Sequence, residues 1–105
     1  KQSQEWLWVE FKNSLGEDGW IHGDAHFVAF ERKYDFIVVN RKELVAMLNN
    51  NTVRYDLPFV KLAKRAKYRI YKRDGKKEEI TQINIKDLKK LESYQLWEKR
   101  DAASD

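Results

Sequence analysis

The stretch EWLWVEFKN, residues 5–13, places a carboxylate and an ammonium group two positions apart in a run of tryptophan and aliphatic side chains. The alternation predicts a β-strand in which Glu10 and Lys12 share one face with Trp6 and Trp8. The apolar side chains of the other face are Leu7, Val9 and Phe11. Metal-dependent hydrolysis of a phosphodiester needs carboxylates that hold Mg²⁺ and a cation near the attacking water. Glu10 and Lys12 could supply both, and the alternative is an ion pair on the sheet surface.

A second set of metal-binding side chains occurs in HGDAH, residues 22–26. His22, Asp24 and His26 alternate, so on a strand they could share one face and bind a divalent metal. The alternative is that both histidines lie near a turn and form ordinary surface hydrogen bonds. The pattern therefore defines a candidate metal site with Asp24 at its centre.

The segment 61–77 is strongly basic, with nine Lys and Arg residues against Asp74 alone. Tyr68 and Tyr71 are interleaved with these cations. Lys and Arg make most contacts to phosphates, and aromatic rings can stack on unpaired bases. The alternative is an edge hairpin whose lysines prevent strand-to-strand aggregation. The residues that we expect to contact nucleic acid are Lys64, Arg65, Lys67, Arg69, Lys72 and Arg73.

The composition of the chain suits one domain. It has 105 residues, of which 42% are hydrophobic and 36% charged, and its formal net charge is +4. There is no cysteine, which excludes disulfides and thiolate metal ligands. No apolar run approaches the roughly 20 residues that cross a bilayer. We expect a cytoplasmic (intracellular) protein without a membrane partner, either one domain over 1–105 or the C-terminal part of a longer nuclease domain.

Periodicity and turn residues predict the order of the elements. The first strand should reverse through the glycine-rich turn at 14–20 into a second strand that begins at Asp24. Asp74-Gly75 is a preferred hairpin turn, whereas the stretch around Pro58 is ambiguous. The expected elements are strands at 5–13, 24–31 and 35–40, a helix at about 41–49, a hairpin at 67–85 and a helix at about 87–99. Together they predict an α+β or α/β fold with a mixed β-sheet and flanking helices.

A hydrophobic strand that carries Glu-x-Lys resembles the third motif of the PD-(D/E)-x-K nuclease superfamily. The longer stretch WVEFKNSLGEDGWIHGDAHFVAFERKYDFIVVNRKELV is similar to phage-type proteins of that superfamily. Their pattern is a motif strand, a glycine-rich turn, Gly-Trp, a further strand and an Arg-Glu-Leu helix start. The resemblance covers about residues 5–48 and implies a restriction-endonuclease-like fold.

The resemblance also implies an activity and its residues. Glu10 would be a metal ligand, and Lys12 would orient the nucleophilic water or stabilise charge on the phosphate. The superfamily uses a further acidic ligand on the preceding strand, and only KQSQ precedes Glu5 here. Asp24 is the expected substitute, unless a preceding segment or a second chain supplies the acid.

The function predicted from the sequence is therefore that of a Mg²⁺-dependent, or Mn²⁺-dependent, endonuclease-like domain that cleaves or binds DNA. Its expected partner is nucleic acid, with DNA the expected form, and a homodimer or second chain could complete the site. The alternative is a small non-enzymatic module of phage or mobile-element type that binds nucleic acid or protein, with Glu10 and Lys12 as a structural pair.

Overall fold

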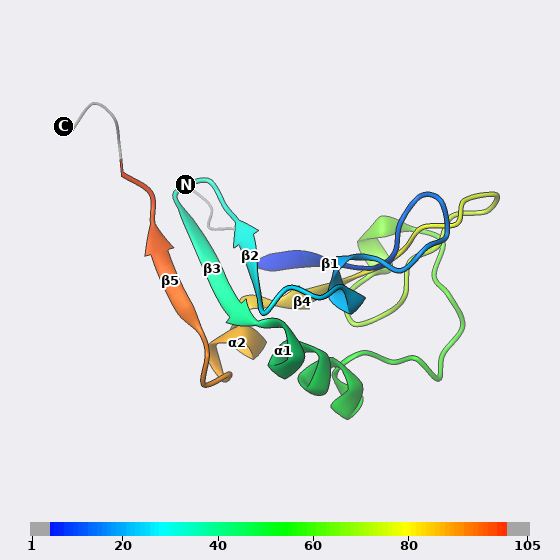
Figure 1. The fold of residues 1–105 in the computed structure, drawn as a ribbon. Coiled ribbons are helices and arrows are strands. Elements are labelled where there is room, and N and C mark those ends of the chain that lie inside the picture. Colours follow the sequence, from blue (N-terminus) through cyan, green and yellow to red (C-terminus); the bar gives the residue numbers. More distant parts are fainter. Residues whose placement is uncertain (1–4, 101–105) are drawn as a thin grey trace.

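Two separate antiparallel sheets organise the computed structural model, which describes residues 5–100 (Figure 1). The strands are β1 (Trp6–Lys12), β2 (Phe27–Glu31), β3 (Asp35–Asn40), β4 (Glu79–Asn84) and β5 (Gln95–Glu98). The first sheet pairs β1 with β4, and the second has the order β2-β3-β5. The fold is α+β, as predicted, but its ladders are antiparallel, so the predicted mixed sheet is wrong.

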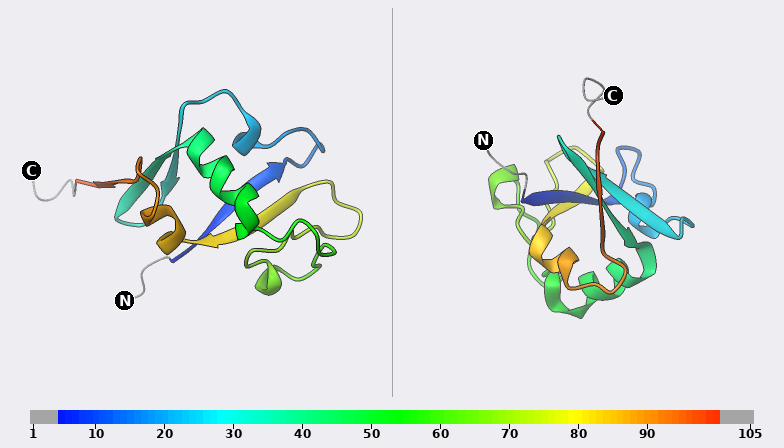
Figure 2. Two further views of the ribbon diagram at one scale, coloured as in Figure 1. Left: turned by 90° about the horizontal axis from the view of Figure 1, so that it is seen from below. Right: turned by 90° about the vertical axis from the view of Figure 1, so that its left-hand side faces the viewer.

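The helical elements are short. They are η1 (Trp20–His22), α1 (Arg41–Met47), η2 (Leu48–Thr52), η3 (Ala63–Arg65) and α2 (Ile85–Lys89). Asn40 caps α1, because its side chain accepts a hydrogen bond from the Glu43 backbone N–H, as the sequence predicts. Figure 2 shows α1 crossing in front of the β1–β4 ribbon when the molecule is seen from below.

Glu43 also ties the start of α1 to the segment that leads into β5. Its carboxylate accepts hydrogen bonds from both the backbone N–H and the hydroxyl of Ser93. The Ser93 hydroxyl oxygen in turn accepts a hydrogen bond from the Asn40 backbone N–H at 2.8 Å. These bonds with Ser93 lower the pKa of Glu43. The helix cap and the β5 connection therefore form one hydrogen-bonded unit.

The core lies between the two sheets and the helices. The predicted inner face of β1, with Leu7, Val9 and Phe11, is buried, which confirms the alternation. The other buried apolar side chains come from both sheets, from the helices and from the segments between them: Ile21, Phe30, Ile37, Val39, Leu44, Leu48, Val53, Ala66, Ile70, Ile83 and Leu88. Each large apolar side chain buried here contributes about 1.5–3 kcal/mol. This shared core holds both sheets in a fixed relation to α1.

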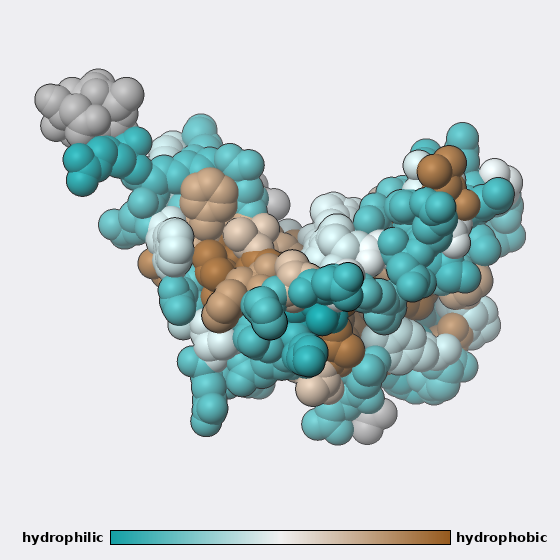
Figure 3. Space-filling model, viewed as in Figure 1, coloured by the Kyte–Doolittle hydropathy of each residue, from teal (hydrophilic) through white to brown (hydrophobic). Residues whose placement is uncertain are grey.

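The second sheet begins with a hairpin between β2 and β3. Arg32 and Asp35 close it with two hydrogen bonds, 2.6 Å from Nε and 2.8 Å from the terminal nitrogen. Large apolar side chains stay exposed on this sheet, including Phe27 at 53% and Trp97 at 57%. Figure 3 shows apolar atoms gathered over the region of β2 and β3.

The predicted strand order fails at β1. We expected β2 to return beside β1, but β2 pairs with β3, and β1 pairs with β4 from much later in the chain. The predicted helix at 87–99 is also wrong, because α2 ends at Lys89 and Gln95–Glu98 forms β5. The apolar residues of QLWE fit the spacing of a strand as well as that of a helix. The edge of β3 is available for pairing, and there Phe36 lies opposite Trp97.

The predicted hairpin at 67–85 forms only in part. Its turn is present, since the Lys76 N–H donates to the Arg73 carbonyl at 3.1 Å and Gly75 has a φ of +75°. Its second half is β4, but its first half is irregular and bonds to β4 at isolated points. One of these is Tyr71, which exchanges both backbone hydrogen bonds with Ile80. We call the segment 61–77, which contains η3, this irregular first half and the turn, the basic arm.

No helix within residues 5–100 is long and apolar enough to cross a membrane.

Candidate functional site

Glu10 and Lys12 do not continue one regular face of β1. Glu10 pairs with Ile80 and Lys12 with Glu79, so β1 has one extra residue, Phe11, between two consecutive residues of β4. This is a β-bulge, which turns the strand and redirects the side chains beyond it. Lys12 therefore points to the same cleft as Phe11 and Glu79. The expectation that Glu10 and Lys12 act from one face is wrong.

The cleft beside the bulge has a volume of about 240 Å³. Its polar lining residues are Lys12, Asp18, His22, Tyr55 and Glu79, and its apolar ones are Phe11, Phe59 and Ile70. We call it the bulge cleft. The loop after β1 closes one side, because the backbone of Asp18 forms a β-bridge with that of Lys12 and Gly19 donates its N–H to the Phe11 carbonyl at 2.8 Å.

Glu79 is the central charge of the bulge cleft. Its side chain is only 15% exposed, and its Oε2 lies 3.7 Å from both the Lys12 Nζ and the Lys72 Nζ. Lys72 also lies over the Phe59 ring, 5.4 Å from its centroid. The cleft thus combines two ammonium groups, a mostly buried carboxylate and aromatic walls. Neither Asp18 nor Glu79 was predicted, because alternation within a strand does not reveal its partner strand.

The candidate ligands around Asp24 are not arranged as a metal site. His22 belongs to η1, and Asp24 and His26 lie in an exposed bend before β2, so the three do not share a strand face. Arg41 holds this bend through hydrogen bonds to the carbonyls of Ile21 and Ala25. Within residues 5–100 no three His, Asp or Glu side chains could hold a metal ion. Glu10 of β1 and Asp24 of this bend are therefore not joined by a third described carboxylate or histidine, and the Mg²⁺ site that the resemblance implies stays a prediction.

Glu10 lies on the other side of the sheet from the bulge cleft. It shares one face of β1 with Trp6 and Trp8, and Trp6, Trp8 and Glu10 pair across the ladder with Asn84, Gln82 and Ile80 of β4. Tyr71 of the basic arm pairs with Ile80 on the far edge of β4. We call the resulting surface, made of Trp6, Trp8, Glu10, Tyr68, Tyr71, Ile80 and Gln82, the aromatic face.

Rings from β1 and the basic arm meet on the aromatic face. Trp6 contacts Tyr68 edge-on with centroids 5.5 Å apart, and Trp8 contacts Tyr71 at 6.2 Å. The Lys67 Nζ lies 4.5 Å from the centre of the Trp6 ring, which is a cation–π contact. Trp8 remains 39% exposed, so its ring is accessible.

Tyr68 fixes the basic arm against this face. Its hydroxyl donates to Asp87 at 2.6 Å, and burial together with this bond raises the pKa of Tyr68 to about 12. Its φ of +58° is unusual for a residue with a side chain. The ring and hydroxyl contacts hold the backbone in this conformation.

The six predicted nucleic-acid contacts divide into two groups. Lys64, Arg65, Lys67 and Arg73 are exposed. Arg69 and Lys72 serve the fold instead, because Arg69 donates to the Pro58 carbonyl at 2.8 Å and Lys72 lies beside Glu79. The arm therefore presents exposed cations next to the rings of the aromatic face.

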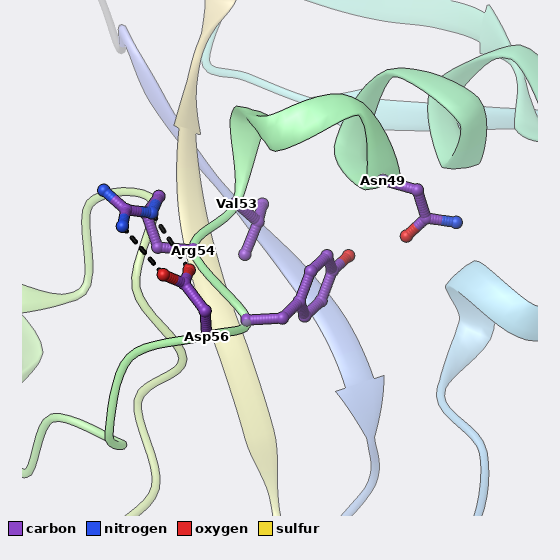
Figure 4. Close-up of a pocket in the computed structure, with 5 residues that line it drawn as sticks. Asn49, Val53, Arg54 and Asp56 are labelled. Atoms are coloured by element: carbon purple, nitrogen blue, oxygen red, sulfur yellow. Dashed lines mark hydrogen bonds and ion pairs between the residues drawn. The ribbon is translucent and has the colours of Figure 1, made fainter.

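A larger cleft of about 480 Å³ lies beside η2 (Figure 4). It is lined by Asn49, Val53, Arg54, Tyr55 and Asp56. The Arg54 guanidinium is already paired with Asp56, at 3.0 Å from Nε and 2.8 Å from the terminal nitrogen. Since its cation is satisfied within the chain, this cleft offers less to an anionic ligand than the basic arm.

Comparison of the chain with protein-family models, curated proteins and solved structures found no match.

Proposed function

We propose that this domain binds nucleic acid, most simply DNA, through the basic arm. The observation that carries the proposal is the contact between Lys67 and Trp6, which sets one exposed cation of the basic arm beside the rings of the aromatic face. Phosphate contacts supply most of the affinity of such surfaces, and each neutralised phosphate releases counterions. The net charge of +4 adds a weak general attraction.

A matched pair of double variants tests the location of the binding surface. K64E/R65E reverses two exposed charges on the arm, and K89E/K90E reverses two exposed charges at the end of α2. Both lower the net charge equally, so any difference between them reports position. We expect K64E/R65E to weaken DNA binding broadly across sequences and to reduce the slope of log affinity against log salt by about two.

Fluorescence anisotropy with a labelled duplex at several salt concentrations measures both quantities. K89E/K90E should change affinity much less than K64E/R65E. Equal effects of the two double variants would show that only net charge matters, and the arm would then not be the interface.

Metal-dependent cleavage of DNA, which the resemblance implies, is the second candidate function. The observation in its favour is the bulge cleft, where Lys12 lies with Asp18, His22 and Glu79. Mg²⁺ is usually bound through one or two carboxylates together with substrate phosphates and water. Because residues 5–100 contain no group of three His, Asp or Glu side chains that could hold a metal ion, this proposal requires a further ligand from DNA or from a second chain.

A plasmid-nicking assay with Mg²⁺ or Mn²⁺ tests the second candidate. If the bulge cleft carries the activity, Lys12→Ala and Glu79→Gln should abolish nicking, whereas Glu10→Ala should not. If the resemblance assigns the site correctly, Glu10→Ala should abolish it too and should weaken metal binding measured by calorimetry. Absence of nicking under all these conditions would refute this second candidate, and the binding proposal would still be decided by the anisotropy experiment.

A further inference from the structure

We infer that the aromatic face selects unpaired nucleic acid, with bases stacked on Trp8 while the basic arm holds the phosphates. This inference rests on the proposed function and adds its substrate class. Stacking on a protein ring requires a base whose ring face is exposed, which a single strand offers and a duplex does not. An exposed ring on this face therefore favours a ligand with unpaired bases.

Trp8 is the accessible ring. Its side chain is 39% exposed, whereas the Lys67 ammonium group lies over the ring of the neighbouring Trp6. Tyr71 supports the Trp8 ring from the side, with centroids 6.2 Å apart. A ring held by a neighbour loses little freedom when a base stacks on it, which lowers the entropic cost of binding.

The distribution of charge separates the place of the bases from that of the phosphates. Glu10 and Gln82 lie on the aromatic face beside Trp8. A carboxylate repels phosphate but accepts hydrogen bonds from base amino groups, and an amide can donate to or accept from base edges. The exposed cations lie on the arm: Lys67 is placed over the Trp6 ring, and Lys64 and Arg65 precede it in η3. A single strand can satisfy both regions by turning its bases toward Trp8 and its backbone toward the arm.

The experiment compares an oligothymidylate single strand with its duplex on oligoadenylate at one salt concentration. The wild-type chain should bind the single strand more tightly, and the strand should quench tryptophan emission. Trp8→Ala should weaken binding of the single strand by about tenfold and leave the duplex affinity unchanged. Trp97→Ala is the matched control, because Trp97 is 57% exposed on the other sheet.

Trp8→Phe distinguishes loss of stacking from loss of folding, since it keeps an aromatic ring and should retain most of the affinity for the single strand. Equal affinities for single strand and duplex, with no effect of Trp8→Ala on either, would overturn the inference and leave the proposed function standing. Failure of the wild-type chain to bind either probe at low salt would overturn the proposed function itself, and the inference with it.

Discussion

Gly19, in the loop after β1, should not tolerate substitution by a larger residue. A Cβ at this position would lie 2.4 Å from the Glu10 carbonyl oxygen and 2.8 Å from its carbonyl carbon. Both atoms belong to the β1 backbone, so a flexible side chain cannot simply move aside. The backbone of Gly19 is ordinary and extended, with φ −78° and ψ 178°. Glycine is therefore required here by close approach and not by conformation.

The size of the effect follows from two opposing terms. Displacing a packed backbone to admit a methyl group costs about 1–3 kcal/mol. Replacing glycine by alanine in an allowed conformation returns about 0.4–1 kcal/mol through the unfolded chain. The net expectation for Gly19→Ala is a loss of about 1–2 kcal/mol, which is a large part of the roughly 5–15 kcal/mol that stabilises a typical domain.

Gly23 supplies the control in the same loop region. Its backbone is also extended, with φ −77°, and a Cβ at this position would lie 3.3 Å from the Trp20 carbonyl oxygen. The Trp20 carbonyl has to move by only a few tenths of an ångström to admit this Cβ, so Gly23→Ala should cost clearly less stability than Gly19→Ala. Urea denaturation of the two variants measures the difference. If Gly19→Ala is as stable as Gly23→Ala, the loop does not pack against Glu10 as described.

Two further predictions concern the basic arm. Gly75→Val should destabilise the fold by about 1 kcal/mol or more in a thermal melt, because Gly75 has positive φ, while Gly75→Asn should cost less; equal melting temperatures for both variants and the wild type would contradict the turn. Tyr68, whose pKa of about 12 exceeds the value near 10 of a free tyrosine, stabilises the fold fully below pH 10, and this contribution should be lost as the pH rises toward 12. Ultraviolet titration should show one late-ionising tyrosine that Tyr68→Phe removes and Asp87→Asn shifts to lower pH; an unchanged titration in Tyr68→Phe would refute the assignment.

The sequence by itself determined those features that depend on neighbours along the chain. Alternation identified the buried face of β1, because a core-facing strand must bury every second side chain. Asn40 and Glu43 marked the start of α1, since a cap acts within one helical turn. Gly75 marked a turn because few other residues adopt its backbone conformation. The concentration of positive charge in the arm could also be read directly.

Only the tertiary structure decided which strands are neighbours. β1 pairs with β4 across most of the chain, and no local pattern encodes that choice. The bulge at Phe11 follows from that pairing, and it separates Lys12 from Glu10 although they are two residues apart. The same pairing brings Lys12 to Glu79, and Trp8 to Tyr71. Both candidate surfaces therefore consist of residues distant in sequence, which the packing of the shared core brings together.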